Sequence, residues 1–287
     1  MPGVQDRVIV VTGAGGGLGR QYALSLAKEG ANVVVNDLGG ARDGSGAGSA
    51  MADQVVAEIR DAGGHAVANY DSVADPEGAA NIITTALDEF GAIHGVVSNA
   101  GILRDGTFHK MPFENWDAVL KVHLSGGYNV IRAAWPHFRE QSFGRVVVAT
   151  STSGLFGNFG QANYGAAKLG LVGLINTLAQ EGAKYNIHAN AVAPVAATRM
   201  TEDILPPEVL DKLKPEFVAP VVVYLCTEEC ADNGSVFVVG GGSVQRVALF
   251  QNEGPKFENP PTVDDIAAHW SEITDLSGAK QASFKAG

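Results

Sequence analysis

Cysteine is almost absent from this 287-residue sequence, and long apolar runs are missing altogether. The two cysteines, Cys226 and Cys230, are too few for a disulfide framework, and no histidine cluster accompanies them to bind zinc. Because no run of 18 apolar residues occurs, we expect no transmembrane span. No apolar targeting segment precedes the first predicted strand. These absences predict a cytoplasmic protein without a metal site.

Basic residues are also scarce. Lys and Arg number 20 against 31 Asp and Glu, which gives a formal net charge of −11. A surface of this charge repels phosphate backbones, so we expect no non-specific binding to nucleic acid. Hydrophobic residues make up 46% of the chain, enough to bury a core. The 36 glycines show no regular period and need a local explanation.

Short β-branched runs alternate with segments of helical periodicity along the first 240 residues. This alternation predicts an α/β fold, a doubly wound parallel sheet with helices on both faces. The seven expected strands are residues 7–12, 32–36, 65–70, 93–98, 145–150, 187–193 and 235–239. The longer expected helices are residues 113–140, 162–184 and 201–227.

The composition changes after residue 242, where apolar runs become rare. We expect a catalytic domain over residues 1–250, followed by a linker and helical extension over residues 251–287. Within the extension, the spacing of Ile266, Trp270 and Ile273 predicts one amphipathic helix over residues 263–276.

A glycine-rich loop joins the first predicted strand to the first helix, with the sequence TGAGGGLG over residues 12–19. Glycine allows the sharp turn and lets backbone N–H groups approach a pyrophosphate, while the helix N-terminus attracts the anion. Gly13, Gly17, Leu18 and Gly19 are therefore expected to bind a dinucleotide. The alternative is a tight turn of purely structural use, which the strand before it and the helix after it disfavour.

Asp37 ends the second predicted strand, 20 residues after Gly17. A carboxylate at this place accepts hydrogen bonds from the ribose hydroxyls of adenosine and repels a 2′-phosphate, which favours NAD over NADP. Arg20, and Arg42 in the glycine-rich stretch of residues 38–49, are the two basic residues that oppose this preference. Without the glycine loop, a turn-forming aspartate is an equally good explanation.

Ser151, Tyr164 and Lys168 carry the strongest chemical signal. Tyr164 and Lys168 are four residues apart on one predicted helix and so share a face. Ser151 follows the fifth strand at the edge where parallel sheets bind ligands. In hydride transfer to NAD, the alcohol must also lose a proton. We expect the Lys168 ammonium and a bound nicotinamide cation to lower the pKa of the Tyr164 phenol, ordinarily about 10, so that Tyr164 takes that proton while Ser151 holds the oxygen.

These motifs resemble those of the short-chain dehydrogenase/reductase family. Residues 12–19 match its TGxxxGxG signature, residues 99–101 its NAG motif, and Ser151 with Tyr164 and Lys168 its catalytic serine and YxxxK. The resemblance covers about residues 5–245. It implies a Rossmann-type fold and a homodimer or homotetramer built on the long helices near residues 113–140 and 162–184.

The resemblance also implies further cofactor contacts. It puts Asp71, Ser72 and Val73 near the adenine, and Asn99 by the adenosine ribose with Gly101 of the same motif. It puts Ala197 and Thr198 by the nicotinamide amide, and gives Lys168 a reach to the nicotinamide ribose.

A closer similarity, to the (3R)-hydroxyacyl-CoA dehydrogenase domains of peroxisomal multifunctional enzymes of type 2, rests on several runs. They are VVNDLGG (34–40), VANYDSV (67–73), NAGILRD (99–105), GNFGQANY (157–164) and KPEFVAP (214–220). This similarity implies NAD-dependent oxidation of a (3R)-hydroxyacyl-CoA, fatty or steroid-derived. It also implies a separate enoyl-CoA hydratase in the same pathway, because no hydratase motif occurs in these residues.

Two positions depart from the family pattern. His123 stands where many members have an asparagine that supports a water relay to the lysine, and the sequence leaves open whether it carries a proton or fills space. Val195 replaces a common glycine after Pro194, at the start of a segment, residues 195–213, expected to roof the substrate pocket.

Three other functions compete with this prediction. Oxidation of a free 17β-hydroxysteroid belongs to the same chemistry. Reduction of a 3-oxoacyl carrier protein with NADPH is opposed by Asp37. A non-catalytic module that senses the dinucleotide is opposed by the intact set of Ser151, Tyr164 and Lys168.

Overall fold

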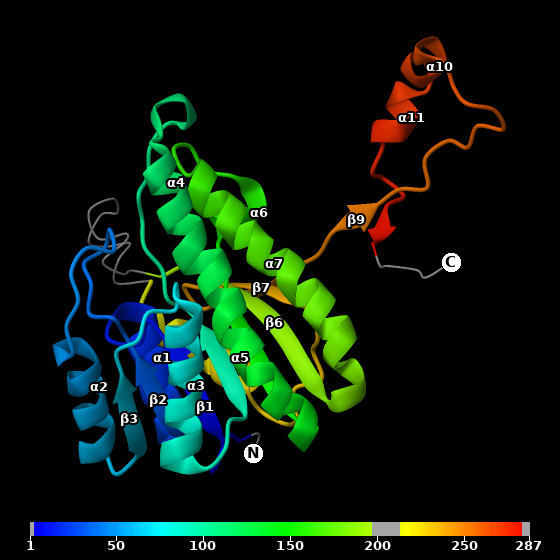
Figure 1. The fold of residues 1–287 in the computed structure, drawn as a ribbon. Coiled ribbons are helices and arrows are strands. Elements are labelled where there is room, and N and C mark those ends of the chain that lie inside the picture. Colours follow the sequence, from blue (N-terminus) through cyan, green and yellow to red (C-terminus); the bar gives the residue numbers. More distant parts are fainter. Residues whose placement is uncertain (1–2, 197–212, 283–287) are drawn as a thin grey trace. The chain divides into compact units, whose positions relative to one another are not determined.

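The computed structural model describes residues 3–196 and 213–282, and the chain forms two compact units, Met1–Gln245 and Arg246–Gly287. The first unit contains an eight-stranded sheet of order β3-β2-β1-β4-β5-β6-β7-β8 (Figure 1). Its strands are β1 (Val8–Thr12), β2 (Asn32–Asn36), β3 (His65–Asn69), β4 (Gly95–Ser98), β5 (Gly144–Ala149), β6 (Ile187–Pro194), β7 (Val236–Gly240) and β8 (Ser243–Val247).

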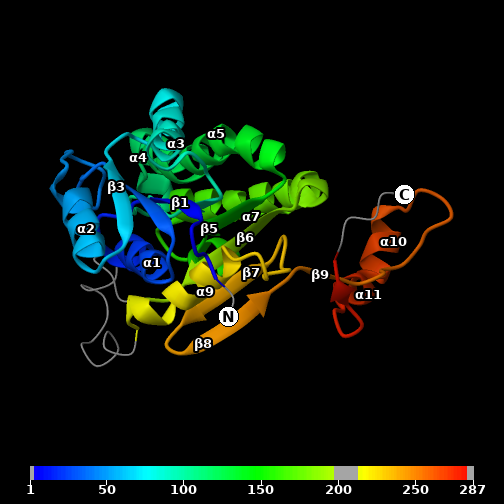
Figure 2. The same ribbon diagram turned by 90° about the horizontal axis from the view of Figure 1, so that it is seen from below.

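Helices cover both faces of this sheet (Figure 2). On one face lie α1 (Gly17–Lys28), α2 (Ala50–Asp61) and α9 (Ala219–Leu225), and α1 packs on both of the others. On the other face lie α3 (Pro76–Phe90), α4 (Phe113–Leu120), α5 (Gly126–Gln141) and α7 (Ala162–Gly182). Shorter elements are α6 (Thr152–Phe156), η1 (Phe108–Lys110), η3 (Ala183–Tyr185) and η4 (Pro215–Phe217). Every residue of β1 and β5 is buried, which explains their continuous β-branched runs.

Strand β1 pairs in parallel with both β2 and β4, so the order of the sheet reverses beside it. In open parallel sheets, ligands bind at such a reversal, beyond the carboxyl ends of the strands. The glycine-rich loop leaves β1 at this edge, and residues 99–101 leave β4 there. The fold therefore brings the two motifs together.

The predicted fold class is confirmed, but the sheet has eight strands where seven were expected. The extra strand is β8, which follows β7 after Gly241 and Gly242. Both glycines have positive φ values, +56° and +80°, as a two-residue antiparallel hairpin turn requires. Strand β8, with the sequence SVQRV, is not predicted because four of its five residues are exposed and the sequence does not alternate between apolar and polar residues.

The long helix expected over residues 113–140 is continuous, but its middle is a π-helical turn, η2 (Lys121–Ser125), between α4 and α5. Insertions of this kind are rare and are often found at functional sites. Here the turn carries His123, whose side chain is buried.

The second unit contains a two-stranded antiparallel ladder, β9 (Phe250–Gln251) with β10 (Lys280–Gln281), and two short helices. The single helix expected over residues 263–276 is wrong: α10 (Val263–Ala268) ends at His269, and α11 (Trp270–Thr274) follows. The side-chain amide of Asn252 donates to the carbonyls of Glu272, Ile273 and Asp275, and so ties the end of α11 to β9. Among the described residues, no helix is long and apolar enough to cross a bilayer.

Candidate active site

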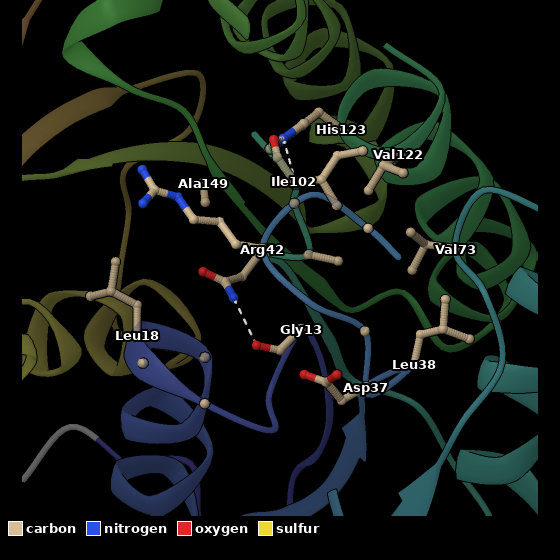
Figure 3. Close-up of a pocket in the computed structure, with 18 of the residues that line it drawn as sticks. Gly13, Leu18, Asp37, Leu38, Arg42, Val73, Ile102, Val122, His123 and Ala149 are labelled. Carbon is tan, nitrogen blue, oxygen red and sulfur yellow. Dashed lines mark hydrogen bonds between the residues drawn. The ribbon is translucent and has the colours of Figure 1, made fainter. Parts of the chain in front are cut away.

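A cavity of about 360 Å³ lies at the carboxyl edge of the sheet. The glycine-rich loop, the ends of β2 to β6 and the start of η2 contribute its walls, and Figure 3 shows several of these side chains converging on it. Most of the predicted cofactor-binding residues lie together in its lining. They are Gly13, Gly17, Leu18, Gly19, Asp37, Asp71, Ser72, Val73, Asn99, Gly101, Tyr164 and Lys168. Ala197 and Thr198 lie outside the described residues, as does most of the expected roof over residues 195–213.

The glycine-rich loop has no room for side chains at two of its positions. A Cβ on Gly19 would lie 2.1 Å from the carbonyl oxygen of Gly13. Gly13 itself has φ +64°, and a Cβ there would lie 2.7 Å from Cα of Ala100. The glycines therefore allow this loop to fold tightly against residues 99–101, and the resulting cradle leaves backbone surface facing the cavity.

Asn99 and Thr12 hold this cradle in place. The side-chain amide of Asn99 donates to the carbonyls of Thr12 and Gly13, both at 3.2 Å (Figure 3). The Thr12 hydroxyl accepts from the backbone N–H groups of Asn99 and Ala100, both at 3.1 Å. The loop after β1 and the motif after β4 are thus fixed to each other by hydrogen bonds within the protein.

Asp37 is oriented by two backbone donors. Its Oδ2 accepts from the N–H of Gly15 at 2.8 Å, and its Oδ1 from the N–H of Gly39 at 2.7 Å. The side chain lines the cavity with Leu38 and Val73 on the same side (Figure 3). A half-buried carboxylate held in this way has remaining lone pairs for hydroxyl donors.

The two basic residues that compete with Asp37 differ in their surroundings. Arg20 pairs with Glu58 of α2 and does not line the cavity. Arg42 lines the cavity, and its carbonyl accepts from the N–H of Leu103 at 3.0 Å. The glycine-rich stretch of residues 38–49 is thereby joined to the segment that follows β4.

Ser151, Tyr164 and Lys168 meet at this edge, as the sequence predicts. Ser151 caps the N-terminus of α6, where its Oγ accepts from the N–H of Ser153 at 3.1 Å, and its hydroxyl lies close enough to Tyr164 to lower the pKa of the phenol. Lys168 lies one turn after Tyr164 on α7, with Nζ 5.5 Å from the centre of the phenol ring. The buried ammonium donates to the carbonyl of Ala149 at 2.5 Å.

Burial shifts the pKa values of Tyr164 and Lys168 in opposite directions. Burial raises the pKa of Tyr164, and the hydrogen bond from Ser151 only partly opposes it. Burial also lowers the pKa of Lys168 to about 7. A buried amine with a pKa near neutrality is a weak source of positive charge toward Tyr164 in the protein alone, and the lowering of the Tyr164 pKa with a nicotinamide cation bound stays a prediction.

Two buried side chains that brace Tyr164 are not predicted as site residues. Asn163 accepts from the N–H of Tyr164 at 2.7 Å and donates to the carbonyls of Arg104 and Asn115. His123 lies against the Tyr164 ring, and its Nε2 is 3.0 Å from the N and 2.8 Å from the O of Ile102. The sequence flags His123 only as a departure from a motif, and it gives no signal for Asn163.

Burial keeps His123 uncharged, because it lowers the pKa of the imidazole to about 3. Its Nε2 accepts from the Ile102 N–H in one tautomer and donates to the Ile102 carbonyl in the other. Nδ1 is the one buried side-chain nitrogen or oxygen in the described part of the chain that has no hydrogen-bond partner. The packing is tight, since a Cβ on Gly101 would lie 2.2 Å from Cε1 of this ring.

Comparison with known proteins identifies relatives of this chain. The family model for short chain dehydrogenases matches residues 7–208. A protein of Mycobacterium tuberculosis named as a short-chain type dehydrogenase/reductase is 85% identical over 285 residues, which cover 99% of this chain and 100% of that protein. A hydroxyacyl-CoA dehydrogenase of the same organism is 39% identical, over 85% of this chain and 80% of the relative.

Among solved structures, the full-length peroxisomal multifunctional enzyme type 2 of Drosophila melanogaster superposes with a TM-score of 0.82. Its sequence is 42% identical, and the match covers 98% of this chain. The chain spans 47% of that larger enzyme. The similarity thus extends over nearly all of the 287 residues.

Proposed function

The chain belongs to the short chain dehydrogenase family, and from this premise we propose that it oxidises (3R)-hydroxyacyl-CoA to 3-oxoacyl-CoA with NAD as the hydride acceptor. The observation that carries the proposal is the meeting of Ser151, Tyr164 and Lys168 beside a cavity whose glycine loop fits a dinucleotide. The acyl-CoA assignment is supported by the similarity to hydroxyacyl-CoA dehydrogenases and multifunctional enzymes.

Each member of the catalytic group has a role in this reaction. NAD, when bound, accepts the hydride from the carbon that bears the hydroxyl group. Ser151 hydrogen-bonds the substrate oxygen and holds it near Tyr164. The Tyr164 phenolate takes the hydroxyl proton as the carbonyl forms, so the C–H and O–H bonds of the alcohol are both broken. Lys168 is fixed by Ala149 and supplies a donor toward the cofactor ribose.

The choice of NAD over NADP is supported by the position of Asp37 and by the ion pair of Arg20. Asp37 presents a carboxylate that favours ribose hydroxyls and repels a 2′-phosphate. Arg20 is paired with Glu58, so engaging a phosphate would require that ion pair to be given up. Cofactor residues Ala197 and Thr198 remain part of the proposal on the strength of the family resemblance.

A substrate panel tests the function directly. Purified protein is mixed with NAD or NADP, and absorbance at 340 nm is followed with (3R)- and (3S)-hydroxyacyl-CoA of several chain lengths, with a steroid-derived acyl-CoA, and with free 17β-hydroxysteroids. We expect turnover of the (3R)-thioesters with NAD. Brisk oxidation of a free steroid without any turnover of a thioester would contradict the acyl-CoA assignment.

We also infer that the protein assembles as a homodimer or homotetramer through α5 and α7. The support is the exposure of Tyr128 on α5 and Leu169 on α7, which are 51% and 49% accessible. Light scattering of the purified protein tests this inference. A monomer mass at micromolar concentration would contradict it.

A further inference from the structure

The glycine-rich stretch after β2 is a folded loop. We call its residues 38–48 the strap. The strap is closed at its base, where the N–H of Gly48 donates to the carbonyl of Leu38 at 2.9 Å. A turn lies within it, where the N–H of Ala41 donates to the carbonyl of Ser45 at 2.7 Å. The strap therefore has a defined backbone that can present a side chain in one direction.

Two hydrogen bonds anchor the strap to the segment that follows β4. The carbonyl of Arg42 accepts from the N–H of Leu103 at 3.0 Å, and the carbonyl of Asp43 accepts from Nε of Arg104 at 2.9 Å. Because β1 lies between β2 and β4 in the sheet, a strap that starts at β2 and reaches this segment crosses the edge at which the glycine-rich loop leaves β1. The backbone of Arg42 is thus held over the cavity.

The side chain of Arg42 is half-buried and lines the cavity. It extends from the strap away from Asp37 and toward the side of the cavity that Leu18 and Ala149 line (Figure 3). Asp37 is the residue expected at the adenosine ribose, whereas Leu18 belongs to the glycine-rich loop. The guanidinium is therefore directed to the loop that is expected to hold the diphosphate, and not to the ribose.

The lining of the cavity holds more basic than acidic groups, although the chain as a whole carries a net charge of −11. Among the described residues of the lining, the two carboxylates are those of Asp37 and Asp71, just after β2 and β3. Four lining side chains carry a basic group, and they are Arg42, Arg104, Lys121 and Lys168. An anionic part of a ligand is therefore favoured on the side to which Arg42 points.

The wall opposite the strap also favours an anion. Gly16, Gly17 and Leu18 line the cavity at the start of α1. The described first turn of α1 contains no acidic residue, and its N-cap, Gly16, has no side chain to accept from the backbone N–H groups. The positive end of the helix thus remains open to a ligand in the cavity.

We propose that Arg42 is a phosphate-binding residue, whose guanidinium contacts the diphosphate of the dinucleotide from the side opposite the glycine-rich loop. The inference rests on the proposed function and adds a residue to its cofactor site. A guanidinium donates two parallel hydrogen bonds to phosphate oxygens, which a lysine ammonium cannot do. Because the strap already fixes the backbone of Arg42, little conformational freedom is lost when these bonds form.

Binding measurements without an acyl substrate test the proposal. The Kd for NADH is measured by the fluorescence of its nicotinamide ring, and other ligands are measured by displacement of NADH. ADP-ribose keeps the diphosphate and lacks the nicotinamide, whereas adenosine lacks every phosphate. Each titration is run at low and at high salt.

Arg42→Met removes the charge and keeps an unbranched side chain, while Arg42→Lys keeps the charge. Lys28→Met, on an exposed position at the other end of α1, is the matched control. We expect Arg42→Met to raise the Kd for NADH and ADP-ribose about tenfold, to leave the Kd for adenosine unchanged, and to lessen the salt dependence of ADP-ribose binding. Arg42→Lys should raise the Kd for ADP-ribose less, and Lys28→Met should leave it unchanged.

Phosphates of other ligands are distinguished in the same variants. Coenzyme A is titrated into NAD-saturated protein, and the Kd for NADP is compared with that for NAD. If Arg42→Met weakens only coenzyme A, the residue contacts the substrate, and if it weakens only NADP, it contacts the 2′-phosphate. Either result overturns the proposal.

The outcomes also separate this role from the function beneath it. An unchanged Kd for ADP-ribose in Arg42→Met, or an equal loss of adenosine binding, would overturn the role of Arg42 and leave the dehydrogenase function standing. Absence of NADH binding by the unaltered protein would overturn both.

Discussion

The imidazole of His123 stands perpendicular to the phenol ring of Tyr164, with ring centres 5.2 Å apart and an interplanar angle of 89°. Tyr164 also packs against a small apolar cluster of Ile102, Val119 and Ala167. One edge of the histidine is fixed by the backbone of Ile102, and the other side packs on the tyrosine. The phenol ring of Tyr164 is thus packed against a neutral, buried imidazole.

The buried His123 predicts a loss of stability in acid. Its pKa is about 3 in the folded chain and about 6.5 in the unfolded chain, so the unfolded state binds more protons between these values. The free energy of unfolding therefore falls as the pH drops below 6.5, and this residue contributes about 2 kcal/mol of the loss at pH 5. Urea unfolding at pH 7 and pH 5 measures it. His123→Asn should be less stable at pH 7 but show a smaller difference between the two pH values; an equal difference would contradict the assignment.

Replacement of Tyr164 by Phe distinguishes a role in proton transfer from a role in NAD binding. The variant lacks the group that takes the hydroxyl proton, so we expect kcat to fall about 10²- to 10⁴-fold while the Kd for NAD barely changes. Stopped-flow turnover and titration calorimetry with NAD measure the two quantities. Retention of kcat in Tyr164→Phe would show that a group other than the Tyr164 phenol takes the proton.

The pH profile of alcohol oxidation should depend on Ser151. Because burial raises the pKa of Tyr164, the phenolate forms on the alkaline side of neutrality, and the oxidation rate rises with pH. Ser151→Ala removes the hydrogen bond that lowers this pKa, so the rising limb moves to higher pH. Ser153→Ala, two residues after Ser151 on α6, serves as the control. If the pH at which the oxidation rate rises is unchanged in Ser151→Ala while the rate itself falls, Ser151 acts only on the substrate.

Asp37 should control the choice between the two nicotinamide cofactors. Asp37→Ala removes the carboxylate that repels a 2′-phosphate, so the ratio of kcat/KM for NAD over NADP should narrow by about tenfold or more. Steady-state assays with both cofactors measure it, and Asp61→Ala at the end of α2 provides a distant acidic control. An unaltered ratio would remove Asp37 from this role.

The glycine-rich loop should tolerate no methyl group at Gly19. A Cβ there lies 2.1 Å from the Gly13 carbonyl oxygen, so Gly19→Ala must displace the loop, and we expect NAD binding to weaken at least about tenfold. Gly173→Ala on α7 meets no atom within 4 Å and should bind NAD normally. NAD titration followed by intrinsic fluorescence compares the two. Normal binding by Gly19→Ala would show that the loop does not cradle the cofactor.

The sequence predicts the parts of this protein that depend on local pattern. The strand-loop-helix context of Gly13 to Gly19, and the four-residue spacing of Tyr164 and Lys168, are enough to place these residues at one edge of a parallel sheet. The exposed hairpin strand β8 shows no such pattern, because its alternate residues do not face a core. Nor does the break at His269 follow from the apolar stripe through Ile266 and Ile273.

Properties that arise from tertiary packing are beyond what the sequence reveals. The extent to which burial raises the Tyr164 pKa in the protein alone depends on the complete fold. The bracing by Asn163 and the anchoring of the strap likewise depend on hydrogen bonds between segments more than 45 residues apart.

The π-helical turn between α4 and α5 has a consequence for how this site tolerates change in length. A turn of this kind contains one residue more than an α-helical turn, and each residue added to or removed from a helix rotates everything beyond it by about 100°. A π turn absorbs its extra residue locally, so excision of one residue from Lys121–Ser125 would restore an α-helical turn between α4 and α5. The extra residue thus determines which side chain of this turn lies between Gly101 and the phenol, the place that His123 occupies.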